Sequence, residues 1–285
     1  VPDRRPFWYN AQCPEECFGL LAFDPGEKTT AAVIDGEAGE WRSDSPVIEY
    51  DGLSVYARSD AGYLYLLIRG ENFDPRSDTV YLPLDVAPDR GNTHTGDLRF
   101  AEGAEYLLRL QGREDSAITV DAAYDAFQFS YSHLHPFFDP MPGQYEQDSG
   151  YFNPIYLALN RPLHLPQTGE ETPFSRIETG RLRYGDARED TLADFCFGAD
   201  FAEIRLPWEL IGFMDPSARQ VMGDLFSGTE IRPVTTEGVR VGIAREGCTE
   251  TVPMALYSWD TWELPVYHER LKQSYAILQD YFSEQ

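Results

Sequence analysis

Carboxylate and amide side chains gather in the sequence DVAPDRGNTHTGD, which begins at Asp85. Asp85, Asp89, Asn92 and Asp97 could supply oxygen ligands to a cation. Calcium prefers roughly six to eight such ligands, and a loop can bring them to adjustable distances. The spacing does not match the EF-hand loop, and Asx-Gly loops also form plain turns. We therefore predict a calcium site in this loop, with an ion-free turn as the alternative.

Two tryptophans lie close together in the sequence SWDTWELP. Trp259 and Trp262 are three residues apart, so they cannot share one face of a regular strand. If a bend separates them, one indole could meet solvent and stack on a pyranose, whose axial hydrogens suit an aromatic face. The alternative is that both indoles are core residues, since tryptophan is mostly buried in sandwiches. Both are kept as candidate sugar-contacting residues.

Other side chains could serve metal binding or catalysis, but each lacks a necessary partner. His133 and His135 would share one face of an extended strand, yet no third metal ligand can be named. Glu203 and Glu209 could act as a glycosidase pair, although a chain with 48 acidic residues yields such pairs by chance. The motifs GxSxG, HExxH and GxGxxG and the Walker sequence are missing. The sequence favours a protein that is not an enzyme.

The composition is that of an acidic, β-rich protein. The 285 residues include 23 basic and 48 acidic ones, so the formal net charge is −25. Nucleic acid and anionic membranes would be repelled by this charge. No run of about 18 apolar residues occurs, so we expect no membrane span. Aromatic residues make up 14% of the chain, and 23 Gly and 20 Pro separate short runs of β-forming residues, which predicts an all-β fold.

The cysteines define neither a disulfide framework nor a zinc site. Cys13, Cys17, Cys196 and Cys248 are too few for a disulfide scaffold in a chain of this length. Cys13 and Cys17 have no close second pair downstream, which argues against a four-thiolate zinc site. Cys196 lies between two phenylalanines and is expected to be a buried strand thiol. Oxidising and reducing compartments are both compatible with these four cysteines.

Short β-forming runs predict the strands that would position the candidate residues. Leu53–Arg58 and Tyr63–Arg69 are separated by the turn sequence SDAG and predict a hairpin. Strands are also expected at 78–86 and 105–112, on either side of the acidic loop, and the strand series continues to about residue 134. Strands joined by tight turns favour an antiparallel meander over βαβ units.

The expected organisation is one domain preceded by an irregular segment. Residues 1–30 contain four prolines and are predicted to form an irregular connector packed on the domain. Residues 31–285 are predicted to form a single antiparallel β-sandwich. Apolar residues at spacings of 4, 4, 3 and 4 from Tyr267 to Phe282 predict a C-terminal helix over 267–283 that packs on the sandwich.

Three segments resemble the family 9 carbohydrate-binding modules and the wider DOMON-like sandwich superfamily. They are VIDGEAGEW at Val33–Trp41, AGYLYLLIRG at Ala61–Gly70 and DTVYLPLD at Asp78–Asp85. The sequence FAEIRLPWELIGF at Phe201–Phe213 is similar to an alternating strand that ends in a Pro-Trp turn in that family. The resemblance covers about half of the chain. It implies an all-β antiparallel sandwich of the jelly-roll or immunoglobulin-like, DOMON-like kind.

The binding residues of that family match this chain only in part. Modules that bind sugar ends stack the sugar on a tryptophan just before the Asp-x-Val strand and bond its hydroxyl groups with a glutamate on that strand. The corresponding places here hold Pro75 and Tyr81. Because a proline ring has no π-face, the resemblance implies that this site is absent or rebuilt. Tyr81 and Trp41 are kept as candidate sugar-contacting residues, with core packing as the alternative for Trp41.

Together these features predict a non-catalytic carbohydrate-binding accessory module, extracellular or at the cell surface. Its expected partners are a polysaccharide or oligosaccharide and a neighbouring domain of the same polypeptide, and its expected cofactor is calcium. The alternatives are a purely structural module between domains and a glycoside hydrolase. The N-terminus lacks the basic and apolar regions of a signal peptide, so we expect either an intracellular chain or a segment of a longer protein.

Overall fold

The structure, a computed structural model, describes most of the chain as two units. The described residues are 21–25, 31–188, 192–226, 228, 230–263, 267–271 and 273–283. Residues Val1–Thr29 and Glu263–Gln285 form one unit, and Thr30–Trp262 form the other. Among the described residues, no helix combines the length and the apolar character needed to cross a bilayer.

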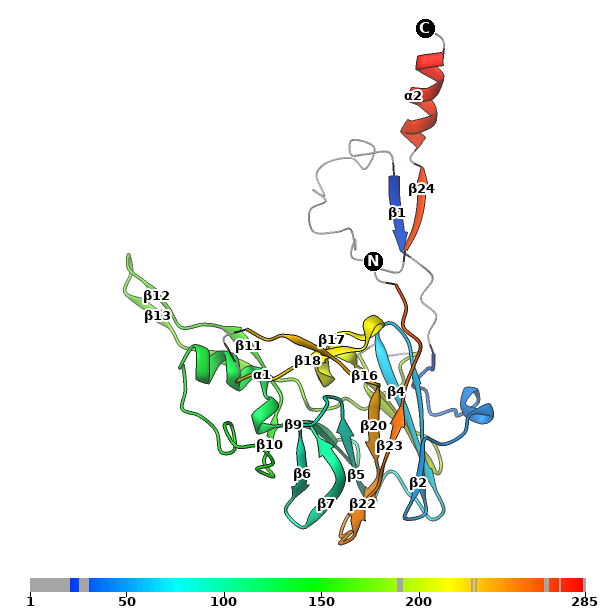
Figure 1. The fold of residues 1–285 in the computed structure, drawn as a ribbon, viewed down its shortest axis with the longest axis vertical. Helices are drawn as coiled ribbons and strands as arrows, with labels where there is room; N and C mark the ends of the chain where they lie inside the picture. Colours follow the sequence, from blue (N-terminus) through cyan, green and yellow to red (C-terminus); the bar gives the residue numbers. More distant parts are fainter. Residues whose placement is uncertain are drawn as a thin grey trace. The chain divides into compact units, whose positions relative to one another are not determined.

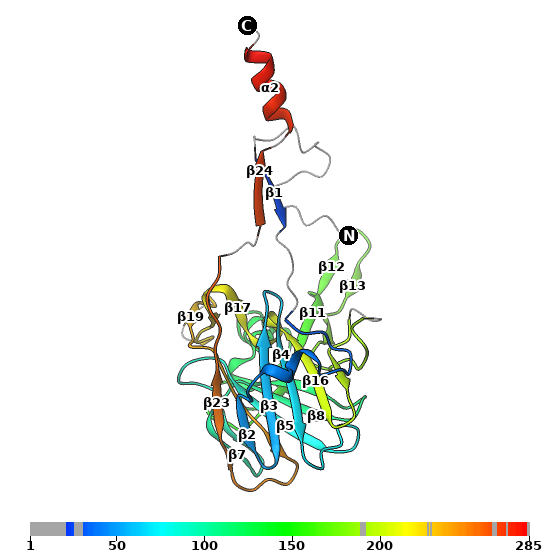
Figure 2. The ribbon, with the colours of Figure 1, turned by 90° about the vertical axis from the view of Figure 1, so that its right-hand side faces the viewer.

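The larger unit is built around two antiparallel sheets, and Figure 2 shows β3, β4 and β16 of one sheet beside β5 and β8 of the other. We name the sheets after β5 and β4. The β5 sheet has the order β10 (Phe152–Pro154), β9 (Ala117–Asp121), β8 (Tyr106–Gln111), β5 (Thr79–Asp85), β20 (Val239–Gly242) and β23 (Met254–Tyr257), and β21 (Ala244–Arg245) also pairs with β5. The β4 sheet has the order β15 (Phe195–Phe197), β16 (Phe201–Pro207), β4 (Tyr63–Gly70), β3 (Leu53–Ser59) and β2 (Ile48–Tyr50).

The main core lies between these two sheets. On β5, Val80, Leu82 and Leu84 are fully buried in it, because every second side chain of a strand points to the same face. β4 is buried on both of its faces: Leu66 belongs to the main core, and Leu67 belongs to a second apolar cluster with residues of the segment 32–41. That segment therefore covers the outer face of the β4 sheet.

A small sheet covers part of the outer face of the β5 sheet. It consists of β6 (Asn92–Thr95), β7 (Leu98–Ala104) and β22 (Thr251–Val252), with β22 parallel to β7. Phe100, Ala104 and Val252 of this sheet pack with Leu107 of β8 and Ala244 of β21. A further small sheet contains β17 (Phe213–Asp215), β18 (Gln220–Met222) and β19 (Pro233–Thr235).

Two short two-stranded ladders form an arm that extends beyond the sheets, as Figure 1 shows. β11 (Tyr156–Asn160) pairs with β14 (Ser175–Glu178), and β12 (Leu163–Leu165) pairs with β13 (Glu170–Thr172). One face of the arm meets an aromatic cluster beside the short helix α1 (Ala126–Gln128). There the guanidinium of Arg176 lies 4.1 Å from the ring centroid of Tyr156, and the rings of Phe127 and Phe138 also lie within cation–π range.

The smaller unit contains one strand pair and a helix. β1 (Leu21–Pro25) pairs antiparallel with β24 (Tyr267–Leu271), and α2 spans Gln273–Ser283. Two expectations need correction here. Leu21–Pro25 is a strand rather than irregular, and the helix begins at Gln273 because 267–271 pair with β1, a partner that helical spacing cannot reveal. The rest of the segment 1–30 lies outside the described residues, and the packing of the helix on the sandwich stays a prediction.

The antiparallel all-β fold is confirmed, together with several elements. β3 and β4 form the expected hairpin, and Trp208–Ile211 form a short 3₁₀ helix that ends at Gly212, whose φ of 78° favours glycine. The expected strand up to residue 134 is wrong, since Phe129–Leu134 are helical. Asp125 starts this helical segment, because its side chain accepts hydrogen bonds from the amides of Phe127 and Gln128.

Candidate functional site

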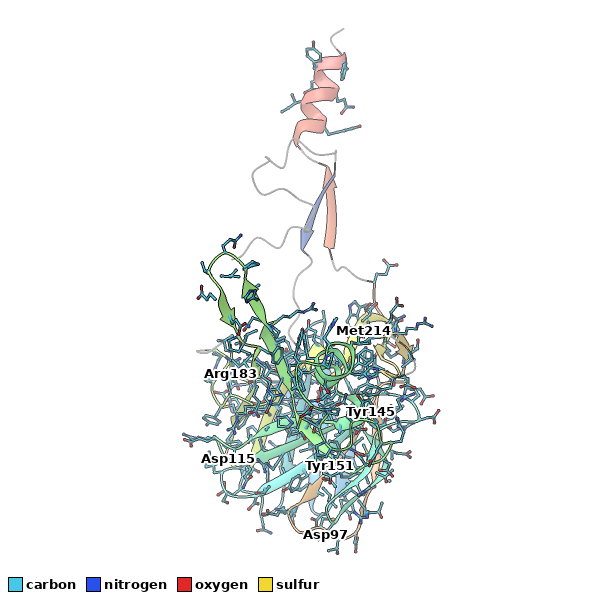
Figure 3. All side chains as sticks on the ribbon, turned by 90° about the vertical axis from the view of Figure 1, so that its left-hand side faces the viewer. Asp97, Asp115, Tyr145, Tyr151, Arg183 and Met214 are labelled. Carbon is cyan, nitrogen blue, oxygen red and sulfur yellow. The ribbon has the colours of Figure 1, made fainter. Side chains whose placement is uncertain are left out.

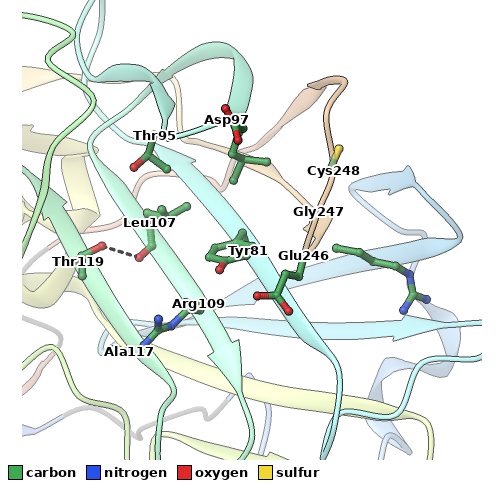
Figure 4. A pocket seen from close by; sticks show the side chains of 13 residues that line it. Tyr81, Thr95, Asp97, Leu107, Arg109, Ala117, Thr119, Glu246, Gly247 and Cys248 are labelled. Atoms are coloured by element: carbon green, nitrogen blue, oxygen red, sulfur yellow. Dashed lines mark hydrogen bonds between the residues drawn. The ribbon is translucent and has the colours of Figure 1, made fainter.

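A recess on the outer face of the β5 sheet brings an aromatic ring together with charged side chains (Figure 4). Strands β5, β8 and β9 form its floor, where Tyr81 lies opposite Arg109 on the neighbouring strand. Because Val80 and Leu82 fill the core, the alternation of the strand points Tyr81 outward. Arg109 lies in turn opposite Ala117, whose small side chain leaves space above the floor.

Two turns form the walls of this recess. One is the turn between β6 and β7, which carries Asp97, and the other follows β21 and carries Glu246. The pairing of β22 with β7 joins the segments that carry the two turns. The recess has a volume of about 500 Å³, a size typical of small-molecule sites. We call it the Tyr81 recess.

The polar groups of the Tyr81 recess have hydrogen-bonding capacity to spare. The hydroxyl of Tyr81 and the carboxylates of Asp97 and Glu246 make no hydrogen bond within the part of the chain that the structure describes. Among the described residues, Arg109 makes one side-chain hydrogen bond, from Nη2 to the carbonyl oxygen of Asp115 at 3.2 Å. Figure 4 shows Glu246 beside Tyr81, with Asp97 on the hairpin that overhangs the floor. A ligand could therefore meet acceptors and a donor around one aromatic ring.

Arg245 also lines the recess, but its charge is already matched. Its Nη1 lies 3.1 Å from Oδ2 of Asp78, Nη2 donates to the carbonyl oxygen of Glu71, and Nε donates to that of Asp51. The two carboxylates of the recess, on Asp97 and Glu246, thus face one unmatched guanidinium. An anionic ligand would be repelled, whereas an uncharged ligand with many hydroxyl groups would meet both donors and acceptors.

The four residues of the predicted calcium loop lie in three different places. Asp85 and Asp89 line a second recess at the other end of β5, Asp97 lines the Tyr81 recess, and Asn92 is fully buried. The oxygen of Asn92 accepts a hydrogen bond from the amide of Gly150 at 2.8 Å, so it is not free for an ion. The part of the chain that the structure describes holds no group of three or more His, Cys, Asp or Glu arranged for a metal.

A buried carboxyl group organises the start of this loop. Glu105 is fully buried, and its Oε2 accepts hydrogen bonds from the amides of Val86 and Ala87 at 2.7 and 3.1 Å. Burial, and then the charge of Asp85, raises the pKa of Glu105 well above its ordinary value. Burial likewise raises the pKa of Asp85 to about 7, against the opposing effect of Arg240 at 3.6 Å.

Trp41 offers no face to a ligand, so its assignment as a sugar-contacting residue is corrected. Its side chain is buried, and the indole nitrogen donates to Oε1 of Glu203 at 3.0 Å. The other oxygen of Glu203 accepts hydrogen bonds from the amides of Asp35 and Gly36. Trp41 and Glu203 therefore fasten the segment 32–41 to the β4 sheet, which is the core role weighed as the alternative.

The two C-terminal tryptophans lie outside the Tyr81 recess and differ in setting. Trp259 is half-buried against Trp208 and lines a separate recess with Arg219. Trp262 is also half-buried, and its indole nitrogen is buried with no hydrogen-bond partner in the described structure. Trp259 therefore remains a candidate platform, and Trp262 does not line the same recess.

The other candidates for chemistry do not assemble into a site. Glu203 is fully buried and bonded to the segment 32–41, so it cannot reach a substrate with the exposed Glu209. His133 and His135 lie at the end of the helical segment rather than on one strand face. Their rings stack on Phe129 and Phe137 instead. Cys196 is a buried strand thiol, as expected, and Cys13 and Cys17 lie outside the described residues.

Sequence reasoning missed Arg109 and Glu246. The pattern of EYLLRLQG could have indicated Arg109, because Leu108 and Leu110 point into the core and Arg109 must point outward with Tyr81. Nothing comparable marks Glu246, which reaches the recess only because the short strand β21 returns to β5. The exposure of a tyrosine does not indicate the recess either. Tyr145 and Tyr151 are more exposed than Tyr81 but do not line it, and Figure 3 shows both of them above Asp97, which does.

The fold and the recess together define an acidic antiparallel β-sandwich protein with an open polar and aromatic recess on one sheet. No family model, curated protein or solved structure matches this chain. The geometry and chemistry of the recess are therefore the basis for assigning a function.

Proposed function

We propose that the chain is a non-catalytic carbohydrate-binding module whose binding site is the Tyr81 recess. The observation that carries the proposal is one aromatic ring surrounded by groups with unused hydrogen-bonding capacity, namely Asp97, Arg109 and Glu246. A pyranose presents an apolar face of axial hydrogens and a rim of hydroxyl groups, and this arrangement complements both. The resemblance to family 9 and DOMON-like modules supports the same class of ligand.

The proposal includes the setting in which such modules work. The module would be attached to a larger carbohydrate-active polypeptide, outside the cell or at its surface, and would hold that polypeptide on an uncharged glycan. The net charge of −25 disfavours polyanionic glycans, as do the two carboxylates of the recess. The binding residues proposed are Tyr81 as the stacking platform and Asp97, Arg109 and Glu246 as hydrogen-bonding groups.

A test measures the migration of the chain in native gels that contain xylan, glucomannan, mixed-linkage β-glucan or polygalacturonate. We expect retardation by at least one of the three uncharged polysaccharides and none by polygalacturonate. Tyr81→Ala should weaken binding about tenfold, because the stacking face is worth about 1.4 kcal/mol. Tyr81→Phe should keep most of the binding.

The matched control is Tyr151→Ala, which removes a more exposed tyrosine outside the recess and should bind like the wild type. Absence of retardation by all four polysaccharides would contradict the proposed function. Retardation that Tyr81→Ala leaves unchanged would contradict the proposed location of the site.

The exposed face of the arm favours a second candidate function, that of a structural module between domains. Leu157, Leu159 and Ile177 are 57%, 62% and 50% exposed, and Leu157 lies directly opposite Ile177 across the ladder. Isolated two-stranded ladders are marginally stable, so a cover on this face would stabilise the arm. Two results together would favour this candidate. The chain would migrate unchanged in every polysaccharide, and its melting temperature would rise when another domain binds.

A further inference from the structure

A recess beside the end of β23 has the same kind of chemistry as the Tyr81 recess but different residues. Trp259, Arg219, Ser258, Asp260 and Thr261 line a space of about 420 Å³. Arg219 and Ser258 also line a neighbouring space of about 860 Å³, so the two spaces adjoin at these side chains. We call the combined space the Trp259 cleft.

The indole of Trp259 is held rigidly at one end of the cleft. One side packs on Trp208 and Phe213, with ring centroids 4.7 and 5.4 Å away. The indole nitrogen donates to the carbonyl oxygen of Pro216 at 2.8 Å, which fixes the rotation of the ring. The side chain is only half-buried, and its remaining surface lines the cleft. A preorganised aromatic face loses little entropy when a ligand stacks on it.

Arg219 is fixed at the point where the two spaces adjoin. Its backbone is left-handed, with φ at 52°, because it ends the short helix Pro216–Ala218 and its carbonyl oxygen accepts from the amide of Thr236. Nη1 donates to the carbonyl oxygen of Glu237 at 3.2 Å and to Oγ of Ser258 at 3.0 Å. Nε is buried with no partner in the described structure. Nη2 makes no hydrogen bond to a described residue, so this rigid guanidinium keeps a free donor.

The remaining groups of the cleft select for uncharged ligands. The side chains of Asp260 and Thr261 make no hydrogen bond within the described residues, so an acceptor and a hydroxyl stand beside the indole. Five carboxyl groups and two guanidinium groups line the combined space, which makes it acidic overall. A uronate or sulfated ligand would be repelled there.

We infer that the Trp259 cleft is a second glycan-binding site, for an uncharged pyranose oligosaccharide that stacks on Trp259 and bonds to Arg219 and Asp260. The inference rests on the proposed function for the class of ligand, but no residue is shared with the Tyr81 recess. Tyr81 and Asp85 lie on the same face of β5 and four residues apart, so Asp85, at the near edge of the cleft, is roughly 13 Å from Tyr81 along the strand. A module with two sites binds a polysaccharide more tightly than either site alone.

The test is isothermal titration of the chain with linear β-1,4-linked hexasaccharides of glucose, mannose and xylose. The wild type should bind two molecules of at least one hexasaccharide, and Tyr81→Ala should leave one. Trp259→Ala should leave the other, and Asp260→Ala should weaken that same site at least fivefold. Asp260 is exposed and its side chain makes no hydrogen bond or ion pair to a described residue, so this second variant tests the site even if loss of Trp259 disturbs the core.

The outcomes separate the inference from the proposed function. One bound hexasaccharide that Tyr81→Ala abolishes and Asp260→Ala leaves unchanged overturns the second site and leaves the proposed function standing. One bound hexasaccharide that depends on Trp259 and Asp260 but not on Tyr81 overturns the proposed location and supports the cleft. One bound hexasaccharide that is weakened by Tyr81→Ala and by Asp260→Ala alike supports both sites, because a single hexasaccharide is long enough to reach from one to the other. No binding of any hexasaccharide overturns both. Binding of a galacturonate hexasaccharide at the cleft overturns the ligand class.

Discussion

Three donors converge on the carboxylate of Glu203, in the middle of a strand and away from solvent. The indole of Trp41 and the amides of Asp35 and Gly36 all point at its two oxygens. Burial raises the pKa of Glu203 to about 7, although each of these hydrogen bonds acts in the opposite direction. The side chain therefore holds the segment 32–41 in place, and its loss would leave the buried indole and two partly buried amides without a partner.

We predict that Glu203→Ala lowers the free energy of unfolding by about 2 to 3 kcal/mol, since the buried indole and the two partly buried amides each lose a partner at a cost on the order of 1 kcal/mol. Urea unfolding followed by tryptophan fluorescence measures the change. The matched control is Glu209→Ala, which removes an exposed glutamate that makes no side-chain hydrogen bond to a described residue. Equal stability of the two variants would show that Glu203 does not hold the segment 32–41.

Individual site residues could be predicted from the sequence only where a strand pattern fixes their direction. Tyr81 lies between core residues of β5, so its outward direction follows from alternation. Trp41 has no such pattern around it, and its burial depends on Glu203, which lies 162 positions further along the chain. The four predicted calcium ligands lie apart for a related reason. The loop is organised by Glu105, and the local sequence does not reveal that Glu105 is buried.

Among the elements, the arm is held at its base by aromatic packing and one cation–π contact. The guanidinium of Arg176, on β14, lies against the ring of Tyr156 on β11 and near the rings of Phe127 and Phe138. At an exposed position such as Arg176, a cation over aromatic rings contributes about 0.5 to 1 kcal/mol. Because the arm is a pair of two-stranded ladders, this contact adds to the packing of Tyr156 and Phe174 on Phe127 in holding the base.

We predict that Arg176→Ala loosens the arm without unfolding the sandwich. Amide hydrogens at 156–178 should exchange several-fold faster, while those of β4 and β16 keep their protection. Hydrogen exchange read by mass spectrometry gives both values in one experiment. Arg161→Ala is the control, because Arg161 is an exposed arginine of the same arm with no side-chain contact to a described residue. Faster exchange in both variants, or in neither, would contradict the role given to Arg176.

Elements formed by neighbours in sequence were predictable, whereas those formed by distant partners were not. The β3–β4 hairpin and the 3₁₀ helix at Trp208–Ile211 follow from local turn residues. β24 was predicted as helix because its spacing fits a helix, and only its pairing with β1, about 245 positions away, makes it a strand. The segment 129–134 carries alternating polar and aromatic residues, which fit a strand. It is helical instead, because the side chain of Asp125 caps the helical turn that precedes it.

At the scale of the whole molecule, buried carboxyl groups act together with a high negative charge. Burial raises the pKa of Asp85 and Glu203 to about 7, and that of Asp121 and Asp125 to about 6. In the unfolded chain such groups titrate near 4. The folded state therefore binds more protons than the unfolded state between about pH 4 and pH 7.

We predict that the sandwich loses stability as the pH rises from 5 to 8. The pKa values of these carboxyl groups are higher in the folded state than in the unfolded state. Their contribution to stability is therefore complete at a pH below the unfolded-state pKa values and is lost as the pH rises through the folded-state pKa values. The loss should be at least about 3 kcal/mol, and the repulsion within a chain of charge −25 adds to it. Urea unfolding at four pH values measures it, and tryptophan fluorescence reports mainly on the sandwich, which holds four of the five tryptophans. Glu203→Gln should flatten the dependence, and stability that increased with pH would contradict the assignment.

The walls of the Tyr81 recess are turns, whereas its floor is a sheet whose other face is the core. Substitutions of Asp97 and Glu246, one in each turn, can change the shape and charge of the recess without removing a side chain that packs in an apolar cluster. The floor, in contrast, cannot shift register without turning its core residues outward. If the recess binds a glycan as proposed, two short turns would set its specificity while the scaffold stays constant, and sequences that share the scaffold are expected to differ most at these two places.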